Sequence, residues 1–570
     1  MHLRVGALRE TACAVAFLAM ACVSSAVAQQ DARARAVDLG VNLEGVNDWS
    51  RLSPFADLMK SSRVWGSPSD PWIHTVQTDA QGWPLQDAGV VVKVIQNDAG
   101  DPRAASRHVD KGVYRLSFKG RATVRPVSSS GVTVRNYSHD AGTNRSTAEV
   151  VVGDNATQLI LSFVGTQGGV RDVQLLPANA APGQTFSAEF RAAIAPFGTL
   201  RFMDFLRTNG SQVRHWSERT TTSAATQAND KGGAYEYAIQ MANELGKDIW
   251  INVPSLADDA YVRALAELLK QSLAPERVVY VEYSNELWNF VFSQTKQNLE
   301  AAVAEAIAGD TTLTNGKRCT PELFKAESGE CNPYWAGFYR VGKKTARIAQ
   351  IFSEVFGPGA LNTRVRVVYA TQFANPAIAE RVLRNVATYR GKPAALFYAV
   401  AAAPYFYLDE GLARSPRLDA DAIHASLQKS LETEVLPFFA PGVMQKGAFR
   451  KGGAYRGGDG ENPSLKALAD YYGIKSFAYE GGPDLRQENV SLPAKFAANV
   501  DERMGAKMEQ LLQQWYGCGN GLYVHFTLTS TYGRYGHWGL TNDARDLQTA
   551  KYRAVAAAAR RPTADYRTCR

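Results

Sequence analysis

The sequence contains few of the residues that bind metals, and it lacks the common cofactor-binding motifs. Only 6 cysteines and 8 histidines occur among 570 residues, and the histidines are scattered along the chain. There is no His-Glu-x-x-His, no close Cys-x-x-Cys pair, no dinucleotide-binding fingerprint and no Gly-x-Ser-x-Gly. The stretch GFYRVGKK (337–344) resembles a phosphate loop, but Lys344 stands where that loop needs Ser or Thr. We therefore expect neither a metal nor a cofactor.

A strong charge bias and low-complexity tracts are also missing. Lys and Arg number 63 against 55 Asp and Glu, which gives a formal net charge of +8, and the basic residues are dispersed. Nucleic-acid binding needs a basic patch, so we expect no nucleic-acid partner. With 45% hydrophobic and 21% charged residues, the composition is that of a globular protein. We expect the chain to form one large and one smaller domain. We also expect the protein to be a monomer.

The N-terminus has the features of a cleaved secretory signal. Arg4 and Arg9 precede a short apolar stretch that ends in small residues at Ala28. This stretch is too short to span a bilayer, and no later run reaches the roughly 18 apolar residues of a membrane helix. We predict a signal peptide over residues 1–28, cleaved after Ala28, and a secreted or periplasmic protein. A lipoprotein modified at Cys22 is the alternative, although Ala19 stands where a bulky aliphatic residue is usual.

Four cysteines lie outside the signal: Cys319, Cys331, Cys518 and Cys569. In an oxidising compartment four cysteines indicate two disulfides, for which three connectivities are possible. We favour Cys319 with Cys331, which would close a local loop, and Cys518 with Cys569, which would tie down the C-terminal tail. A metal site is the weaker alternative, because no clustered histidines accompany these cysteines.

From residue 186 onwards, apolar strand-like runs alternate with helical patterns, which is typical of parallel βαβ units. Seven such runs occur there, and an eighth lies near the N-terminus. A helix is predicted after this N-terminal strand at 53–62, where Ser53 can cap and Pro54 occupies the first helical position. Eight strands with intervening helices predict an α/β fold, the (β/α)8 barrel. The predicted strands are 37–49, 199–205, 248–254, 278–285, 364–371, 396–406, 474–482 and 521–530.

Residues 72–178 contain no convincing helix but many short alternating segments, separated by Gly, Asp and Asn. Strands at this spacing indicate a β-sandwich. Because it interrupts the barrel pattern, we predict that the sandwich is inserted after the first strand and helix (37–70), and that the rest of the barrel occupies 186–570. Such an insertion is tolerated because barrel loops lie on the surface. Insertion within the barrel fixes the orientation of the sandwich, so we expect the sandwich to brace the barrel.

Two carboxyl groups are expected at one end of this barrel. Glu286 follows Asn285 where the fourth strand ends, and Glu480 ends the seventh strand. Active sites of such barrels are built at the C-terminal ends of the strands, so the two carboxyls should face one another across one site. Such a pair can cleave a glycosidic bond if one carboxyl protonates the leaving oxygen and the other, ionised, lies near the anomeric carbon. Different surroundings must then set their pKa values apart.

This arrangement resembles the clan A retaining glycoside hydrolases, which include family 5 cellulases and mannanases. The resemblance covers the barrel, about residues 37–70 and 186–560, and implies a retaining hydrolase of β-linked poly- or oligosaccharides. It implies that Glu286 is the acid/base, that Glu480 is the nucleophile and that Asn285 hydrogen-bonds the sugar 2-hydroxyl.

Three further residues match this family by position. Arg201 in LRFMD resembles the arginine of strand two that orients the nucleophile, and Tyr405 in APYF resembles a tyrosine of strand six near it. Trp538 in HWGL resembles the platform under the sugar at the cleavage subsite. For Arg201 a purely structural ion pair is the alternative, and for Tyr405 the alternative is core packing.

Aromatic and acidic residues near the predicted strand ends complete the candidates. Trp49 and Trp216 fall in or near the C-terminal loops, where aromatic faces can stack on sugars, and Trp65 and Trp288 share that placement; core packing is the alternative for each. Glu44 on the first strand is a competing carboxylate. Glu282, within the fourth strand, is expected to pair in the barrel interior or on the helix side.

The sequence departs from the family pattern at three positions. Ser255 and Ala403 stand where the family has histidines after strand three and on strand six, and Leu287 replaces the usual Pro after Asn-Glu. These departures motivate an alternative from another class, a non-catalytic carbohydrate-binding envelope protein that keeps the barrel. A transglycosylase, in which a sugar replaces water as the acceptor, is a further alternative on the same residues.

Overall fold

Eight parallel strands close into a barrel in the order β1-β20-β18-β13-β12-β11-β10-β9. The computed structural model describes residues 37–96, 100–102, 108–445, 448–451, 455, 462–566 and 569, so the predicted signal peptide lies outside the described residues. The fold is the (β/α)8 barrel that the sequence predicts, and each predicted range contains one barrel strand. The barrel strands are β1 (Leu39–Asn42), β9 (Thr199–Arg201), β10 (Asp248–Val253), β11 (Val279–Tyr283), β12 (Val365–Ala370), β13 (Ala399–Ala402), β18 (Lys475–Ala478) and β20 (Tyr523–His525).

Large aromatic side chains fill the barrel interior. The parallel register places Trp250 of β10 opposite Tyr280 of β11, and their ring centroids lie 5.7 Å apart. Phe477 of β18 completes this cluster, with its ring centroid 5.9 Å from that of Tyr280. Glu282 lies two residues beyond Tyr280, and Trp250 Nε1 donates to its Oε2 at 2.8 Å. Because side chains two apart share a face of a strand, the apolar interior ends in a charged layer toward the C-terminal ends of the strands.

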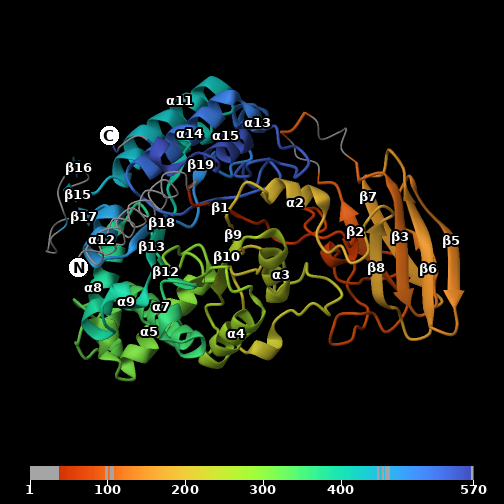
Figure 1. Cartoon of the computed structure of the whole chain (residues 1–570), viewed down its shortest axis with the longest axis horizontal. Helices are drawn as coiled ribbons and strands as arrows, with labels where there is room; N and C mark the ends of the chain where they lie inside the picture. The colour runs from red at the N-terminus through yellow and green to blue at the C-terminus, as the bar shows by residue number, and fades with distance from the viewer. Residues whose placement is uncertain are drawn as a thin grey trace, which may run out of the picture.

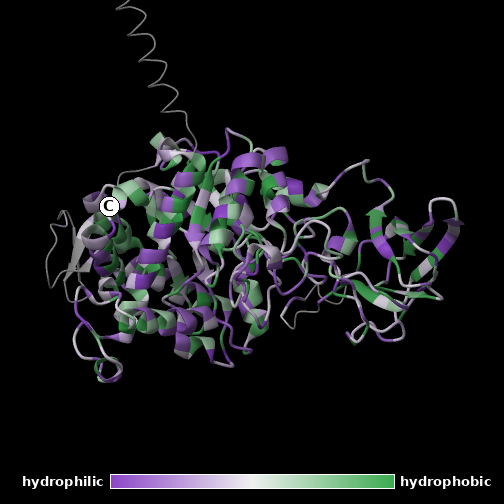
Figure 2. Cartoon of the chain, turned by 90° about the horizontal axis from the view of Figure 1, so that it is seen from below, coloured by the Kyte–Doolittle hydropathy of each residue, from purple (hydrophilic) through white to green (hydrophobic). Residues whose placement is uncertain are grey.

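Helices surround the barrel, and hydrophobic and hydrophilic residues alternate along them, as expected for helices with one face on the barrel (Figure 2). Polar caps set several helix starts. The Asp258 side chain accepts from Tyr261 N at the start of α4, and Asn332 caps α7 with Pro333 in its first turn. The helices are α2 (Ala188–Ile194), α3 (Tyr235–Leu245), α4 (Asp259–Ser272), α5 (Ser293–Ile307), α6 (Pro321–Lys325), α7 (Pro333–Phe356), α8 (Pro376–Tyr389), α9 (Pro393–Leu396), α10 (Glu410–Ala413), α11 (Ala420–Ser430), α12 (Leu465–Tyr472), α13 (Leu492–Val500), α14 (Glu502–Gly517) and α15 (Ala550–Ala558). Short 3-10 or π turns are η1 (Leu58–Ser61), η3 (Trp216–Glu218), η4 (Thr311–Thr314), η5 (Pro358–Ala360), η6 (Leu431–Val435), η7 (Leu436–Phe439) and η8 (Thr563–Asp565).

The prediction of a helix at 53–62 is wrong. Only the turn η1 forms there, and it is capped by Asp57, whose side chain accepts from Met59 N. Before this turn, Phe55 instead forms an antiparallel β-bridge with Phe186. Pairing with a distant segment therefore overrides the local helix signal, as tertiary context often does.

Between β1 and β9 the chain forms two antiparallel sheets, called here the antiparallel region (residues 88–177). One sheet has the order β2-β7-β4 and the other β5-β6-β3-β8, and buried residues such as Val90, Phe118 and Phe163 form one hydrophobic cluster between them. Figure 1 shows these strands at one end of the molecule, beside the barrel. The boundaries 72–178 of a separate inserted domain stay a prediction. The strands are β2 (Ala88–Val94), β3 (Gly112–Lys119), β4 (Thr123–Pro126), β5 (Val132–Asp140), β6 (Arg145–Val152), β7 (Gln158–Val164) and β8 (Arg171–Pro177).

Two small sheets and two disulfides complete the fold. Cys319 is bonded to Cys331, and Cys518 at the end of α14 is bonded to Cys569 in the C-terminal tail, so both favoured pairings are present. In the described part of the chain, no helix is long and apolar enough to cross a membrane. The small sheets are β14 (Tyr405–Tyr407) with β19 (Gly482–Asp484), and β15 (Gly442–Gln445) with β16 (Ala448–Lys451) and β17 (Asn462–Pro463).

Candidate active site

Three strand ends and the start of a fourth strand bring predicted site residues together at the C-terminal end of the barrel. Arg201 is the last residue of β9, Asn285 and Glu286 follow β11, and Glu480 follows β18. Arg201 Nη2 donates to Asn285 Oδ1 at 2.8 Å, and Arg201 Nη1 donates to Glu480 Oε1 at 2.9 Å. The hydroxyl of Tyr405, at the start of β14, donates to Glu480 Oε2 at 2.8 Å. Arg201, Asn285, Tyr405 and Glu480 therefore form one largely buried, hydrogen-bonded cluster, and Glu286 lies within electrostatic reach of Glu480.

The chain leaves β11 through two residues in the left-handed backbone region. Ser284 has a φ of 58° and Glu286 a φ of 45°, a conformation that costs a non-glycine residue roughly 1–3 kcal/mol. Hydrogen bonds hold the turn in place, because Asn252 Nδ2 donates to Ser284 O at 2.7 Å and Thr295 Oγ1 donates to Glu286 O at 3.2 Å. Strain of this kind clusters at functional sites. Here it presents the side chain of Asn285 to Arg201 and that of Glu286 within electrostatic reach of Glu480.

Arg201 is fully buried and links several strands. Its Nε and Nη2 donate to Glu282 Oε2 at 3.1 and 2.9 Å, and its Nη1 donates to Asn42 Oδ1 at 2.9 Å. Together with the bond to Glu480, the planar guanidinium holds two carboxylates in a fixed geometry. The sequence left two locations open for Glu282, the barrel interior and the helix side. In the structure Glu282 lies in the barrel interior.

Glu480 is 5% exposed and accepts hydrogen bonds from two donors of different charge. Burial raises its pKa above the ordinary value, and the positive charge of Arg201 and the hydroxyl of Tyr405 limit this rise. A charged donor stabilises a carboxylate much more than a neutral one does. Of Glu480 and Glu286, Glu480 is therefore the carboxyl that is better suited to be ionised.

Glu286 has neutral donors only. Asn289 Nδ2 donates to its Oε2 at 3.0 Å, and the hydroxyl of Tyr479 donates to its Oε1 at 3.2 Å. Trp288 Nε1 donates in turn to that hydroxyl at 3.2 Å. Burial, together with the negative charge of Glu480, raises the pKa of Glu286 to about 8. At neutral pH Glu286 can therefore hold a proton for transfer, while Glu480 can act as a nucleophile.

A groove of about 710 Å³ opens over the ends of β1, β9 and β20. The predicted residues Trp49 and Trp538 line it, as do Glu44 and Asp204. Burial raises the pKa of both carboxyls to about 7, and for Asp204 the charge of Glu480 adds to this effect. Asp204 thus lies within electrostatic reach of Glu480, so the groove lies beside Glu480, although neither Glu480 nor Glu286 lines it.

Two of the tryptophans considered from the sequence lie away from this groove. Trp216 of η3 packs against Tyr235 and Tyr261, with ring centroids 6.0 and 5.1 Å from its own. Trp65 is buried in the hydrophobic cluster of the antiparallel region. Trp216 therefore packs η3 against α3 and α4 and does not line the groove.

Three residues of this site were not singled out from the sequence. Asn42 ends β1 and donates to the carbonyls of Tyr479 and His525 at 3.0 and 3.2 Å. Asn42 and Asp204 each stand at or just beyond a barrel strand, and a polar residue there is the signal that would have found them. Tyr479 has no such signal, because an aromatic residue in a strand pattern indicates core packing.

The positions where the sequence departs from the family pattern are also buried. Ser255, after β10, accepts at its carbonyl from Tyr283 OH at 2.7 Å. Ala403 packs in the apolar cluster of the barrel interior. Among the described residues, no group of three or more His, Cys, Asp or Glu is arranged to hold a metal ion.

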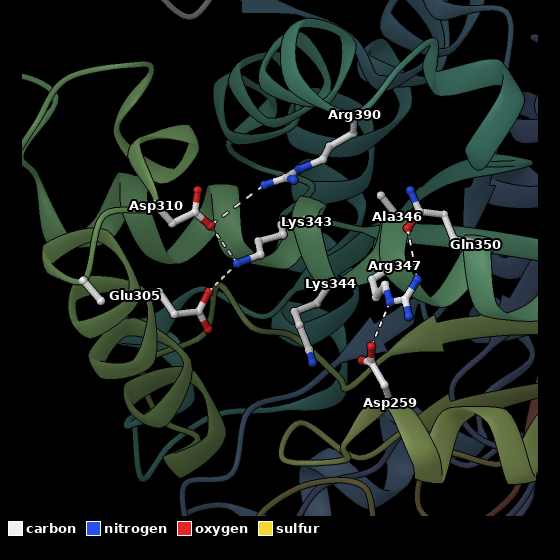
Figure 3. A pocket seen from close by; sticks show the side chains of 10 residues that line it. Asp259, Glu305, Asp310, Lys343, Lys344, Ala346, Arg347, Gln350 and Arg390 are labelled. Carbon is white, nitrogen blue, oxygen red and sulfur yellow. Dashed lines mark hydrogen bonds and ion pairs between the residues drawn. The ribbon is translucent and has the colours of Figure 1, made fainter.

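A second cavity, of about 540 Å³, lies on the outer side of the barrel and is lined by charged residues of α4, α5 and α7 (Figure 3). Lys343 Nζ pairs with Glu305 Oε2 at 2.6 Å and with Asp310 Oδ2 at 2.7 Å. Arg347 Nε pairs with Asp259 Oδ2 at 2.8 Å. Carboxylates thus neutralise most cations of this cavity, and none of the predicted site residues lines it.

No protein-family model matches this chain, and no curated protein matches it either. Solved structures similar to it include a GH51 arabinofuranosidase from Xanthomonas axonopodis pv. citri, at 11% identity, a TM-score of 0.38 and 67% coverage of each chain. A GH10 xylanase from Thermobacillus composti matches at 11% identity and a TM-score of 0.30, over 64% of this chain and 89% of that one. A family 1 β-glucosidase from Thermotoga maritima matches at 12% identity and a TM-score of 0.31, over 65% and 84%. Likenesses this distant carry no conclusion about family or activity.

Proposed function

We propose that this protein is a glycoside hydrolase that cleaves β-linked oligo- or polysaccharides with retention of the anomeric configuration. One observation carries the proposal: two buried carboxyls share one barrel end, Glu480 bonded to Arg201 and Glu286 with a pKa raised to about 8. Glycosidic cleavage requires this combination of an ionised carboxylate and a protonated carboxyl. Retention is inferred from the resemblance of Asn285, Glu286 and Glu480 to the clan A enzymes.

In the first step, Glu480 attacks the anomeric carbon and the bond from that carbon to the leaving oxygen breaks. Glu286 gives its proton to the leaving oxygen, so the departing sugar is released as a neutral alcohol. The products on the protein are a glycosyl ester of Glu480 and an ionised Glu286. Asn285 is positioned by Arg201, and we assign it a hydrogen bond to the sugar 2-hydroxyl.

In the second step, water replaces the leaving sugar. Esterification removes the negative charge of Glu480, which is one of the causes of the high pKa of Glu286. Glu286 is then a carboxylate that takes a proton from water, while the water oxygen attacks the anomeric carbon. The ester bond breaks, Glu480 leaves as a carboxylate beside Arg201, and both groups regain their starting protonation states.

Paired glutamine substitutions test the assignment of roles. We expect Glu480→Gln to abolish hydrolysis of a panel of β-glycans, and Glu286→Gln to lower kcat by about 10²–10⁴-fold. The loss in Glu286→Gln should be smaller for aryl glycosides with good leaving groups, which need less protonation. The control is Glu267→Gln, which changes an exposed glutamate of α4. If both site variants hydrolyse every substrate like the unchanged protein, the proposal is wrong.

The anomeric product distinguishes retention from inversion. We expect proton NMR of an early time point to show the β-anomer as the first product. Binding of glycans without hydrolysis would instead support the non-catalytic alternative, and transfer of the glycosyl group to a second sugar would support a transglycosylase.

We also propose that the protein acts outside the cytoplasm as a monomer. The two disulfides support an oxidising compartment.

A further inference from the structure

The groove beside the carboxyl pair is not built from the barrel alone. Val94, the last residue of β2, lines it together with Gln96. Arg63 lines it as well, from the segment that leads from β1 to β2. The antiparallel region, which lies beside the barrel in Figure 1, thus contributes a wall of the groove.

Arg63 is fixed to this wall. Its backbone N donates to Val91 O of β2 at 2.9 Å, and its Nε pairs with the buried Asp48 at 3.0 Å. Its guanidinium carbon lies 4.5 Å from the centroid of the Trp72 ring, a typical distance for a cation stacked on an indole. Arg63 therefore connects the lining of the groove directly to Trp72.

Trp72 is 43% exposed, yet it is held by a rigid turn. Its backbone N donates to Asp70 Oδ1 at 3.2 Å. Its neighbour Pro71 packs so closely on Gly66 and Gly89 that a Cβ there would lie 2.3 and 2.4 Å from Pro71 atoms. These two glycines also exchange backbone hydrogen bonds of 2.8 and 2.9 Å, which fasten the turn to β2. A large indole is thus presented to solvent with its position fixed in advance.

We propose that Arg63 and Trp72 form a remote sugar subsite, and that the substrate is a chain of several β-linked sugars. This inference rests on the proposed function, which supplies the carboxyl pair beside the groove. An exposed indole face can stack on the apolar face of a sugar ring, and a guanidinium can donate to its hydroxyls. The groove volume of about 710 Å³ falls in the range of ~300–1,000 Å³ that is typical of ligand pockets.

Length-dependent binding tests this subsite. The binding measurement uses the full chain with Glu480→Gln and calorimetric titration of β-1,4-linked glucose, mannose and xylose oligosaccharides, from disaccharide to hexasaccharide. We expect affinity to rise with length, and Trp72→Ala to reduce the gain from disaccharide to hexasaccharide by about tenfold. Trp72→Phe, which keeps an aromatic face, should restore most of that gain. The matched control is Tyr137→Ala, because Tyr137 is 41% exposed on β5 of the same region and does not line the groove.

The outcomes separate this inference from the proposed function. Loss of hydrolysis in Glu480→Gln together with an unchanged length gain in Trp72→Ala would overturn the subsite alone. An equal loss of affinity at every length, or the same effect in Tyr137→Ala, would also overturn it, because both indicate a general effect on the protein. Full hydrolysis by Glu480→Gln would overturn the proposed function first. If the Glu480→Gln protein with an otherwise unchanged groove binds none of the oligosaccharides, both the subsite and the proposed function are overturned.

Discussion

At the scale of single residues, the charge of the donors around each carboxyl decides which one keeps its proton. Glu480 is bonded to a guanidinium, whereas Glu286 has only an amide and a phenol as donors. The difference has a direct consequence for pH dependence. Because Glu286 must be protonated in the first step and its pKa is raised to about 8, we expect kcat/KM to fall as the pH rises through about 8.

A change of substrate shows whether Glu286 is responsible for this limb of the profile. The measurement is kcat/KM from about pH 5 to 10, with an aryl glycoside whose leaving group needs no protonation as the comparison. That substrate should lose the alkaline limb. An alkaline limb of the same position and depth for both substrates would show that another group controls it.

The raised pKa of Glu286 also affects stability. The folded protein keeps this proton up to about pH 8, whereas the unfolded chain loses it near the ordinary value of 4.5. Raising the pH between these values therefore favours unfolding, by at most about 1.4 kcal/mol per pH unit. Glutamine cannot ionise, so we expect Glu286→Gln to be more stable than the unchanged protein above pH 4.5, by a margin that grows up to about pH 8.

Urea unfolding at several pH values measures this margin. Glu267→Gln, at an exposed site, should show no such growth with pH. A constant margin for Glu286→Gln would mean that Glu286 is ionised throughout the range.

At the scale of elements, local pattern decides some structures and distant pairing decides others. The eight barrel strands are predictable because each is a short apolar run between helical patterns. The structure of the segment at 53–62 was not predictable, because the pairing of Phe55 with Phe186 joins residues that are far apart in the sequence. Glu480 could be predicted from its strand end, and Arg201 and Tyr405 were predicted from the resemblance to the clan A family. The packing of Trp216 on Tyr235 and Tyr261 could not, because it depends on how η3 meets two helices.

The two disulfides close loops of different length, and their contributions to stability should differ accordingly. Cys319 and Cys331 are separated by 12 positions, whereas Cys518 and Cys569 are separated by 51. Loop-closure entropy predicts a loss of about 3 kcal/mol for the first bridge and about 4 kcal/mol for the second. We expect Cys518→Ser with Cys569→Ser to lower the free energy of unfolding more than Cys319→Ser with Cys331→Ser. The reverse order in denaturant titrations would show that local packing around Cys319 outweighs loop length.

At the scale of the whole molecule, the barrel and the antiparallel region have separate hydrophobic clusters joined by polar contacts. Lys93 of β2 is central to this junction, because its Nζ donates to the carbonyl of Ser50 and to Ser53 Oγ in the loop after β1. Asp57 adds a second link, since its Oδ1 accepts from Leu175 N of β8 at 2.9 Å. Buried polar contacts of this kind are costly to leave unpaired, so separation of the two parts should be unfavourable.

Scanning calorimetry tests whether these contacts make the two parts unfold together. We expect one transition for the unchanged chain, with equal calorimetric and van't Hoff enthalpies. Lys93→Met keeps the length and apolar stem of the side chain but removes its donors to the loop after β1. It should therefore split the transition, with the antiparallel region unfolding at the lower temperature because it has the smaller hydrophobic cluster. Two transitions in the unchanged chain would show instead that the groove wall and the barrel are only loosely coupled, and a remote subsite on that wall would then lack the fixed position that the binding of a long glycan requires.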